Sequence, residues 1–171
     1  FHAYNRDAML SGKLYRPQKL AAVYEQLGRL GLPLYVTEIT VSGTGNDGPA
    51  LQAAVVANLY RLWFSTPMMA GVTWWNLGDG TAYEHENKAL GGLLDQEMNP
   101  KPAYRALDRL INEEWKTRTQ AQTDARGMAR FRGFFGKYQI EVTSAGETKR
   151  FEIEHTQAGE KTHRLMVGVA K

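Results

Sequence analysis

The chain has 171 residues, of which 43% are hydrophobic and 23% are charged, a composition typical of a folded globular protein rather than a disordered one. Its 21 basic and 18 acidic side chains give a net charge of +3, too small to indicate nucleic-acid binding; residues 1–117 carry 11 basic and 12 acidic side chains, and residues 118–171 carry 10 and 6. The absence of cysteine excludes disulfides, cysteine-ligated metal sites and thiol catalysis, and no apolar stretch approaches the ~20 residues that span a bilayer.

The chain opens on Phe1 without the charged and apolar regions of a signal peptide, so we expect mature sequence or the interior of a longer protein. Three alternating segments follow. Apolar residues at helical spacing predict helices over Arg16–Gly31 and Pro49–Thr66. The β-branched and aromatic run Leu34–Ile39 between them predicts a buried strand.

A second strand and a third helix continue this alternation. Gly71–Leu77 has the composition of a buried strand, a long loop runs from Gly78 to about Leu90, and Pro102–Trp115 has one apolar side at helical spacing. Helices that alternate with buried strands are typical of parallel sheets, and in a (β/α) barrel the loops after the strands form the active site. The sequence therefore predicts an α/β fold of the barrel type.

The last part of the chain has a different pattern. Apolar and polar residues alternate over 138–143 and 151–154, and Leu165, Val167 and Val169 predict a further strand. This pattern predicts a small antiparallel β-sandwich-like domain. We therefore expect two domains, 1–117 and 118–171.

Two features at the predicted strand ends could carry chemistry. Glu38 is an acidic residue at the C-terminal end of an otherwise apolar strand, where barrel enzymes keep catalytic groups; the alternative is a structural carboxylate bonded to a loop amide or an arginine. Trp74 and Trp75 end the second strand, and an indole there could stack on a sugar ring or belong to the core. His2 cannot be interpreted from its neighbours alone.

Three other segments are weaker candidates. Residues 83–86 lack the helical spacing of a zinc motif, and the glycines of 43–48 are not followed by the Lys-Ser or Lys-Thr of a phosphate loop. A solvated strand face explains the arginines of 126–132 better than a nucleic-acid patch does. We therefore expect no metal, no cofactor and no nucleic-acid partner.

Three blocks within residues 1–116 carry a more specific pattern. In Gly31–Val41 a small residue and an apolar strand lead into Thr37, Glu38 and an apolar residue, and residues 71–79 and 92–104 follow at fitting distances. These blocks resemble the catalytic domain of glycoside hydrolase family 10, the endo-β-1,4-xylanases, whose nucleophile signature has Asp or Asn where this chain has Thr40. The resemblance implies the C-terminal portion, about strands six to eight, of a (β/α)8 TIM barrel, a fold of about 250 residues.

The same resemblance implies the roles of four residues. Glu38 matches the nucleophile, His2 falls where the family has a histidine that hydrogen-bonds it, Trp75 matches the tryptophan that closes over the sugar, and Tyr83 lies near a second aromatic lid position. The implied activity is retaining, endo-acting hydrolysis of β-1,4-xylan by double displacement, in a secreted or periplasmic bacterial protein. Retaining glycosidases need a second carboxyl group ~5–5.5 Å from the first.

In the family that acid/base residue lies on a strand that precedes Phe1, so we expect the 171 residues alone to be inactive. We also expect the missing N-terminal half of the barrel, or a second copy, to cover the exposed strands. Two alternatives remain open. A non-catalytic carbohydrate-binding or scaffold protein derived from the same barrel would keep Glu38 and lack the acid/base, and a related β-glucanase would keep the mechanism and change the sugar. Residues 118–171 could bind carbohydrate, but they contain no Trp, which favours a structural appendage.

Overall fold

The structure is a computed structural model that describes residues 1–12 and 16–167 of the chain. The chain divides into two compact units, Phe1–Glu113 and Glu114–Lys171. Within the described residues, no helix combines the length and the hydrophobicity that crossing a membrane requires.

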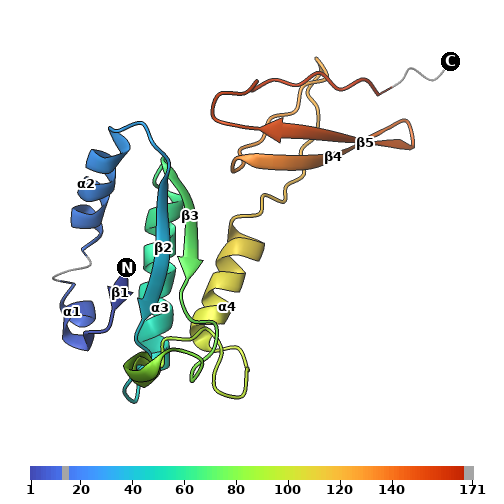
Figure 1. The fold of residues 1–171 in the computed structure, drawn as a ribbon. Helices are drawn as coiled ribbons and strands as arrows, with labels where there is room; N and C mark the ends of the chain where they lie inside the picture. The colour runs from blue at the N-terminus through green and yellow to red at the C-terminus, as the bar shows by residue number, and fades with distance from the viewer. Residues whose placement is uncertain (13–15, 168–171) are drawn as a thin grey trace. The chain divides into compact units, whose positions relative to one another are not determined.

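The first unit is built on a three-stranded parallel sheet in the order β1-β2-β3 (Figure 1). In this sheet His2 lies opposite Thr40, and Leu34 lies opposite Met69. Helices connect the strands, as a parallel order requires, so the carboxyl ends of all three strands meet at one edge. The elements are β1 (His2–Ala3), α1 (Arg6–Ser11), α2 (Pro17–Gly28), β2 (Leu34–Val41), α3 (Gly48–Phe64) and β3 (Met69–Trp74).

The ends of these elements follow local chemistry. Pro17 and Pro49 lie in the first turns of α2 and α3, where the missing N–H costs nothing because the helix leaves that group unpaired. Gly31 has a φ of +70° and turns the chain from α2 into β2, a conformation that glycine adopts without strain. The helices and strands predicted before Gly78 are all present, with ends shifted by at most three residues.

The segment after β3 holds a short 3-10 helix, η1 (Glu84–Ala89), and then α4 (Pro102–Arg109). The helix predicted over Pro102–Trp115 is α-helical only as far as Arg109, because a π-helical turn, η2 (Leu110–Glu114), follows it. Apolar residues at helical spacing do not distinguish an α-helical turn from one wider turn, so the sequence pattern gave no sign of this change.

The core of the first unit lies between β2 and the helices α3 and α4. Ile39 and Val41 of β2 are fully buried, and in Figure 1 α3 runs along one face of the sheet. The Nε1 group of Trp63 donates a hydrogen bond to the Tyr24 hydroxyl at 2.8 Å and joins α3 to α2. The helical part of the core consists of Val56, Leu59, Trp63, Ala103, Leu107 and Leu110, and each large apolar side chain contributes about 1.5–3 kcal/mol on burial.

The described residues of the second unit contain one antiparallel hairpin, β4 (Gly136–Ser144) and β5 (Glu147–His155). Ala145 and Gly146 form its two-residue turn with φ angles of +50° and +82°, the geometry that matches the twist of the two strands. One face is apolar and half-buried. The other carries polar cross-strand pairs, including the 2.8 Å ion pair between Arg150 and Glu141.

The third strand predicted from Leu165, Val167 and Val169 is not formed in the described residues. Residues 162–167 belong to no strand, and Val169 lies outside the described part of the chain. Leu165 and Val167 are half-buried while Met166 is exposed, so the alternation determines which side of the segment faces the protein. A segment becomes a strand only when its backbone hydrogen-bonds to the edge of another strand, and alternating residues do not by themselves bring such an edge close enough. The described residues of this unit thus form a hairpin and lack the second sheet that a sandwich requires.

Candidate active site

Glu38 lies at a bulge in β2. Val36 and Ile39 of β2 pair with Val72 and Trp74 of β3, so β2 has one extra residue in this interval. Val36 and Ile39 are both buried although they lie three positions apart, whereas strict alternation would put them on opposite faces. The bulge therefore keeps both apolar side chains in the core and leaves the half-exposed Glu38 on the open side of the sheet, near its carboxyl edge.

His2 faces Glu38 from the neighbouring strand. Its Nε2 atom lies 3.4 Å from Oε2 of Glu38, and the two side chains are 34% and 43% exposed. The backbone fixes this arrangement, since the Phe1 nitrogen donates to the Glu38 carbonyl at 2.6 Å and Thr40 N–H donates to the Phe1 carbonyl at 3.0 Å. The imidazole ring also stacks on Tyr4, with ring centroids 5.5 Å apart and planes 7° apart.

The two tryptophans at the end of β3 differ in their surroundings. Trp74 Nε1 donates to the Gly91 carbonyl at 3.2 Å. Trp75 is 46% exposed, and its Nε1 group donates to the Glu86 carboxylate at 3.0 Å. The backbone N–H of Trp75 donates to the Ile39 carbonyl at 3.0 Å, one residue after Glu38. Trp75 is therefore the accessible indole beside Glu38, held at its polar end by a loop carboxylate.

Tyr83 lies in the loop after β3, immediately before η1, and is 74% exposed. The structure thus brings Glu38, His2 and Trp75 together on adjacent strands and leaves Tyr83 on the more distant loop. Among the described residues, no group of three or more His, Asp or Glu side chains is arranged so that it could hold a metal ion.

A buried ion pair supports the loop after β3, and the sequence analysis missed it. Lys101 and Asp79 are 8% and 7% exposed, and Lys101 Nζ lies 2.9 Å from Asp79 Oδ2. The same ammonium group donates to the Leu90 carbonyl at 2.7 Å, and the backbone N–H of Gly92 donates to Asp79 at 2.8 Å. These bonds join Asp79, at the start of the loop, to Leu90 and Gly92 at its end. The loop between them contains Glu86, which accepts the hydrogen bond from Trp75. Lys101 stands between two prolines, 22 residues from Asp79, and no local pattern predicts their pairing.

Gln52 of α3 is a second buried support. Its Nε2 group donates to the Val41 carbonyl at 2.8 Å and to the Gly92 carbonyl at 3.3 Å. The side chain therefore links the end of β2 to the loop after β3. A glutamine inside a helical pattern indicates a solvated position, so only the packing of the loop onto α3 shows this role.

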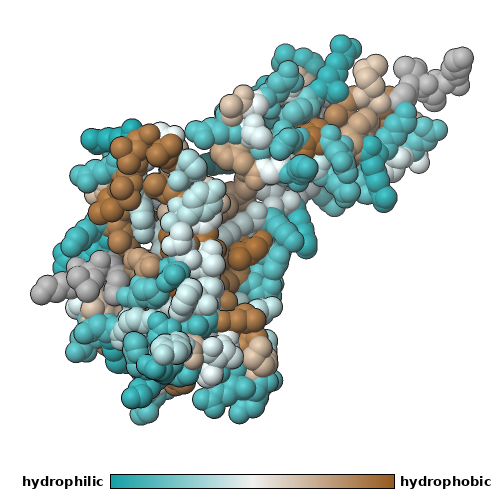
Figure 2. Space-filling model, viewed as in Figure 1, coloured by the Kyte–Doolittle hydropathy of each residue, from teal (hydrophilic) through white to brown (hydrophobic). Residues whose placement is uncertain are grey.

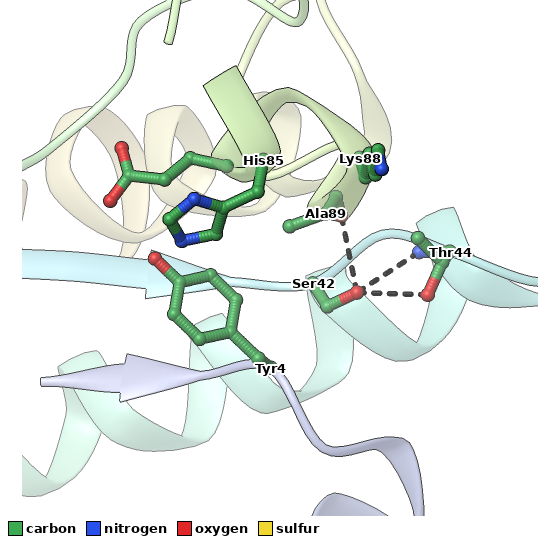
Figure 3. Close-up of a pocket in the computed structure, with 7 residues that line it drawn as sticks. Tyr4, Ser42, Thr44, His85, Lys88 and Ala89 are labelled. Carbon is green, nitrogen blue, oxygen red and sulfur yellow. Dashed lines mark hydrogen bonds between the residues drawn. The ribbon is translucent and has the colours of Figure 1, made fainter. Parts of the chain in front are cut away.

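A pocket of about 350 Å³ lies at the same edge of the sheet (Figure 3). Figure 3 shows the Tyr4 hydroxyl pointing toward the His85 ring, and the Ser42 hydroxyl bonded to the Ala89 carbonyl at 3.1 Å and to Thr44 Oγ1 at 2.9 Å. The pocket is lined by Tyr4, Ser42, Thr44, His85, Glu86, Lys88 and Ala89. Polar groups that follow all three strands therefore surround a cavity next to the His2–Glu38 pair.

Two loop carboxylates near this edge have lowered pKa values. The hydrogen bond from Arg6 to Asp47, at 2.6 Å, holds the pKa of the Asp47 carboxyl below its usual value. The backbone N–H of Asn99, at 2.8 Å, does the same for the pKa of Asp95. In both cases the hydrogen bonds favour the ionised form of the carboxyl group, so neither group donates a proton at neutral pH. Both carboxylates instead stabilise the loops in which they lie.

Comparison with known proteins gives a consistent family. The profile of Glycosyl hydrolase family 10 matches residues 6–109, a range that contains Glu38, Trp75 and Tyr83. Endo-1,4-beta-xylanase B of Thermotoga neapolitana is 27% identical over 103 residues, which cover 55% of this chain and 29% of that protein. Anti-sigma-I factor RsgI6 of Acetivibrio thermocellus is 32% identical over 130 residues, which cover 76% of this chain and 16% of that protein.

Among solved structures, native xylanase 10B of Thermotoga maritima superposes with a TM-score of 0.50 at 24% identity, covering 57% of this chain and 32% of that one. This likeness shows the fold. The chain spans less than a third of the length of each of these relatives. Because the family profile matches more than half of its residues, the chain belongs to glycosyl hydrolase family 10.

Proposed function

We propose that these residues form the nucleophile side of a retaining, endo-acting xylanase-like hydrolase, with Glu38 as the nucleophile. The observation that carries the proposal is the pairing of Glu38 with His2 Nε2 at 3.4 Å, near the carboxyl edge of a parallel sheet. We further propose that β1, β2 and β3 correspond to strands six to eight of the (β/α)8 barrel. The family membership of residues 6–109, a range that contains Glu38, β2 and β3, supports these assignments, and β1 follows from its parallel pairing with β2.

In the proposed reaction a carboxylate oxygen of Glu38 attacks the anomeric carbon, and the glycosidic C–O bond breaks to give a covalent glycosyl-enzyme. Water then attacks the same carbon and releases Glu38. His2 donates its Nε2–H to the carboxylate and holds it in one orientation. The exposed ring of Trp75 offers an apolar platform to the C–H face of the sugar, and the bond to Glu86 fixes the indole plane. Tyr83 would close over the bound sugar from the loop.

The leaving oxygen needs a proton from a second carboxyl group ~5–5.5 Å from Glu38. We propose that this group belongs to a part of the protein outside the 171 residues, as the fraction of its relatives that the chain spans suggests. The isolated chain should then show no hydrolysis of xylan or of an aryl xyloside.

The exposed apolar side chains of the first unit favour a covering partner. Leu30, Leu32 and Tyr35 are 69%, 63% and 63% exposed, and Figure 2 shows apolar residues gathered at the end of α2 and the loop that follows it. Three strands cannot close a barrel. We propose that further β/α units of the same barrel cover these surfaces, in preference to a second copy of the chain.

The test is hydrolysis by the polypeptide that contains this chain. We expect release of xylo-oligosaccharides from xylan, little release from cellulose, and a loss of at least a thousandfold in kcat for Glu38→Gln, because the amide cannot attack the anomeric carbon. Glu25→Gln is a matched control, since Glu25 is an exposed carboxylate on α2. Equal activity of the two variants would exclude Glu38 as the nucleophile, and faster cleavage of cellulose would favour a β-glucanase.

A non-catalytic role in carbohydrate binding is the second candidate. The observation that favours it is the match to Anti-sigma-I factor RsgI6, whose name describes a regulator, over 76% of this chain. Xylan binding by the whole polypeptide without any turnover would support this role and exclude the first. In either role we propose a secreted or periplasmic protein with a polysaccharide ligand.

We propose that residues 118–171 form an all-β accessory domain with a structural role. Its aromatic residues contact one another: the rings of Phe131 and Tyr138 lie 5.5 Å apart, and those of Phe135 and His155 lie 5.0 Å apart. The Tyr138 hydroxyl also bonds to Thr117 at 3.1 Å. Affinity electrophoresis of the protein with and without these residues, in a gel containing xylan, tests the role. Retardation that depends on residues 118–171 would contradict it.

A further inference from the structure

The imidazole of His2 has polar neighbours at both of its nitrogens. Nε2 faces Glu38 at 3.4 Å, and Nδ1 lies 3.3 Å from the hydroxyl of Tyr4. Tyr4 follows β1 directly and stands two positions after His2, so both side chains project from the same side of the extended chain. Their rings are parallel within 7°. The hydroxyl and the stacked ring of Tyr4 thus restrain the imidazole on the side away from Glu38.

The residue that lies opposite His2 in the sheet does not hydrogen-bond to Nδ1 of its ring as Tyr4 does. Thr40 lies opposite His2 in the parallel ladder. Its side chain is completely buried, and its hydroxyl oxygen has no hydrogen-bond partner. A Cβ at Gly91 would lie only 2.6 Å from the Thr40 methyl group, so the loop after β3 covers Thr40 closely. Thr40 therefore provides no polar partner for His2, whereas Tyr4, two positions after His2 and just past the end of β1, provides one.

The hydrogen-bonding chemistry of a neutral imidazole makes this arrangement directional. One ring nitrogen carries a hydrogen and donates, and the other accepts. A carboxylate only accepts, so the nitrogen that faces Glu38 must be the donor. Nδ1 is then the acceptor, and the Tyr4 hydroxyl can donate to it. The opposite tautomer would place two lone pairs against each other at the Glu38 contact.

We propose that Tyr4 is a positioning residue that holds His2 in the Nε2–H tautomer and aims this N–H at Glu38. The role of this N–H in catalysis rests on the proposed function of Glu38, whereas the tautomer itself does not. Tyr4 also lines the pocket beside His85 (Figure 3), so its hydroxyl connects that pocket to the His2–Glu38 pair.

The test compares Tyr4→Phe with Tyr4→Leu. Tyr4→Phe keeps the stacked ring and removes only the hydroxyl, and Tyr4→Leu removes both. In protein labelled with [15N]-histidine, the Nδ1 and Nε2 shifts of His2, assigned with a His2→Gln variant, report the tautomer at a pH where the ring is neutral. We expect the Nε2–H form to dominate in the unaltered protein and a shift of both resonances toward the averaged values of free histidine in both Tyr4 variants.

Two controls are built into the chain. Tyr104→Phe alters an exposed tyrosine on α4, and Thr40→Val removes the buried hydroxyl opposite His2; both should leave the His2 shifts unchanged. Unchanged His2 shifts in Tyr4→Phe would overturn the proposal, and so would an Nδ1–H tautomer in the unaltered protein, a result that needs no variant to fold.

Kinetics of the whole polypeptide give a second readout. A lost hydrogen bond of this kind lowers kcat by about three- to tenfold, with KM unchanged, to the same extent in Tyr4→Phe and Tyr4→Leu. If Tyr4 served only as a packing surface, Tyr4→Phe would retain the kcat of the unaltered protein, and the proposal would fail. An unaltered protein without any hydrolytic activity would contradict the proposed function, while the tautomer measurement would still decide the role of Tyr4.

Discussion

The Lys101–Asp79 pair provides a quantitative test of how the loop after β3 is held. Lys101→Met keeps most of the side-chain volume and removes the ammonium group, which makes contacts of 3.1 and 2.9 Å to Asp79 and 2.7 Å to the Leu90 carbonyl. Asp79 is only 7% exposed, so its carboxylate would stay buried in the variant. It would lose both bonds from Lys101 and keep the hydrogen bond from the Gly92 N–H. Breaking one side of a buried ion pair costs about 3–5 kcal/mol.

This cost is a large share of the 5–15 kcal/mol that is typical of a folded protein. In urea unfolding followed by tryptophan fluorescence, a loss of 4 kcal/mol with a slope of about 2 kcal/mol per M moves the midpoint by about 2 M. Arg29→Met is the matched control, because the Arg29–Glu25 pair is 73% and 74% exposed. Such an exposed pair contributes about 0.3–0.5 kcal/mol.

A double variant separates the charge from the packing. Asp79→Asn combined with Lys101→Met leaves no unpaired buried charge and keeps an acceptor for the Gly92 N–H, so we expect it to recover more than half of the lost stability. If Lys101→Met costs no more than Arg29→Met, or if the double variant is less stable than Lys101→Met alone, the reasoning about the buried pair is wrong.

Three further predictions follow from single contacts. Thr40→Val should leave stability unchanged or raise it by about 1 kcal/mol, because the Thr40 hydroxyl is buried without a partner; a loss above 1 kcal/mol in urea unfolding would reveal a partner. Burial raises the pKa of Tyr60 to about 12 from 10.0, so the stability that this contributes is complete below pH 10 and is lost as the pH rises from 10 to 12. Unfolding midpoints across this range should fall less in Tyr60→Phe, and equal falls would contradict the burial argument. In the whole polypeptide, Glu86→Ala removes the acceptor of Trp75 Nε1 and should raise KM for xylan by about three- to tenfold with little change in kcat; an unchanged KM would mean that the bond does not position the indole.

Several features could be predicted from the sequence because they depend on local patterns. Apolar spacing predicted α2, α3 and the strands β2 and β3, since a helix and a strand each bury one repeating set of positions. The alternation of these elements predicted a parallel sheet, and with it the meeting of strand ends at one edge. The residues around Glu38 predicted the family, which the profile match to residues 6–109 confirms.

Other features depend on contacts between residues far apart in the chain. The bulge between Val36 and Ile39 exists only relative to Val72 and Trp74, so no property of β2 alone reveals it. The Lys101–Asp79 pair is likewise invisible until the loop after β3 has folded back onto the sheet.

The family and the order of elements from α2 to β3 could be predicted from the residues alone, because both follow from side-chain type at local spacing. Glu38, expected next to the end of its strand, lies three residues before the end of β2. Which polar groups face one another depends on how the elements pack together. This packing paired His2 with Thr40 in the ladder, left the Thr40 hydroxyl buried without a partner, and put the Tyr4 hydroxyl at Nδ1 of His2. It also left residues 162–167 outside any strand despite their alternation. The physical reason is the same in each case: a hydrogen bond needs two groups within about 3 Å, and for groups on different elements that distance is fixed by strand register and loop packing rather than by local sequence.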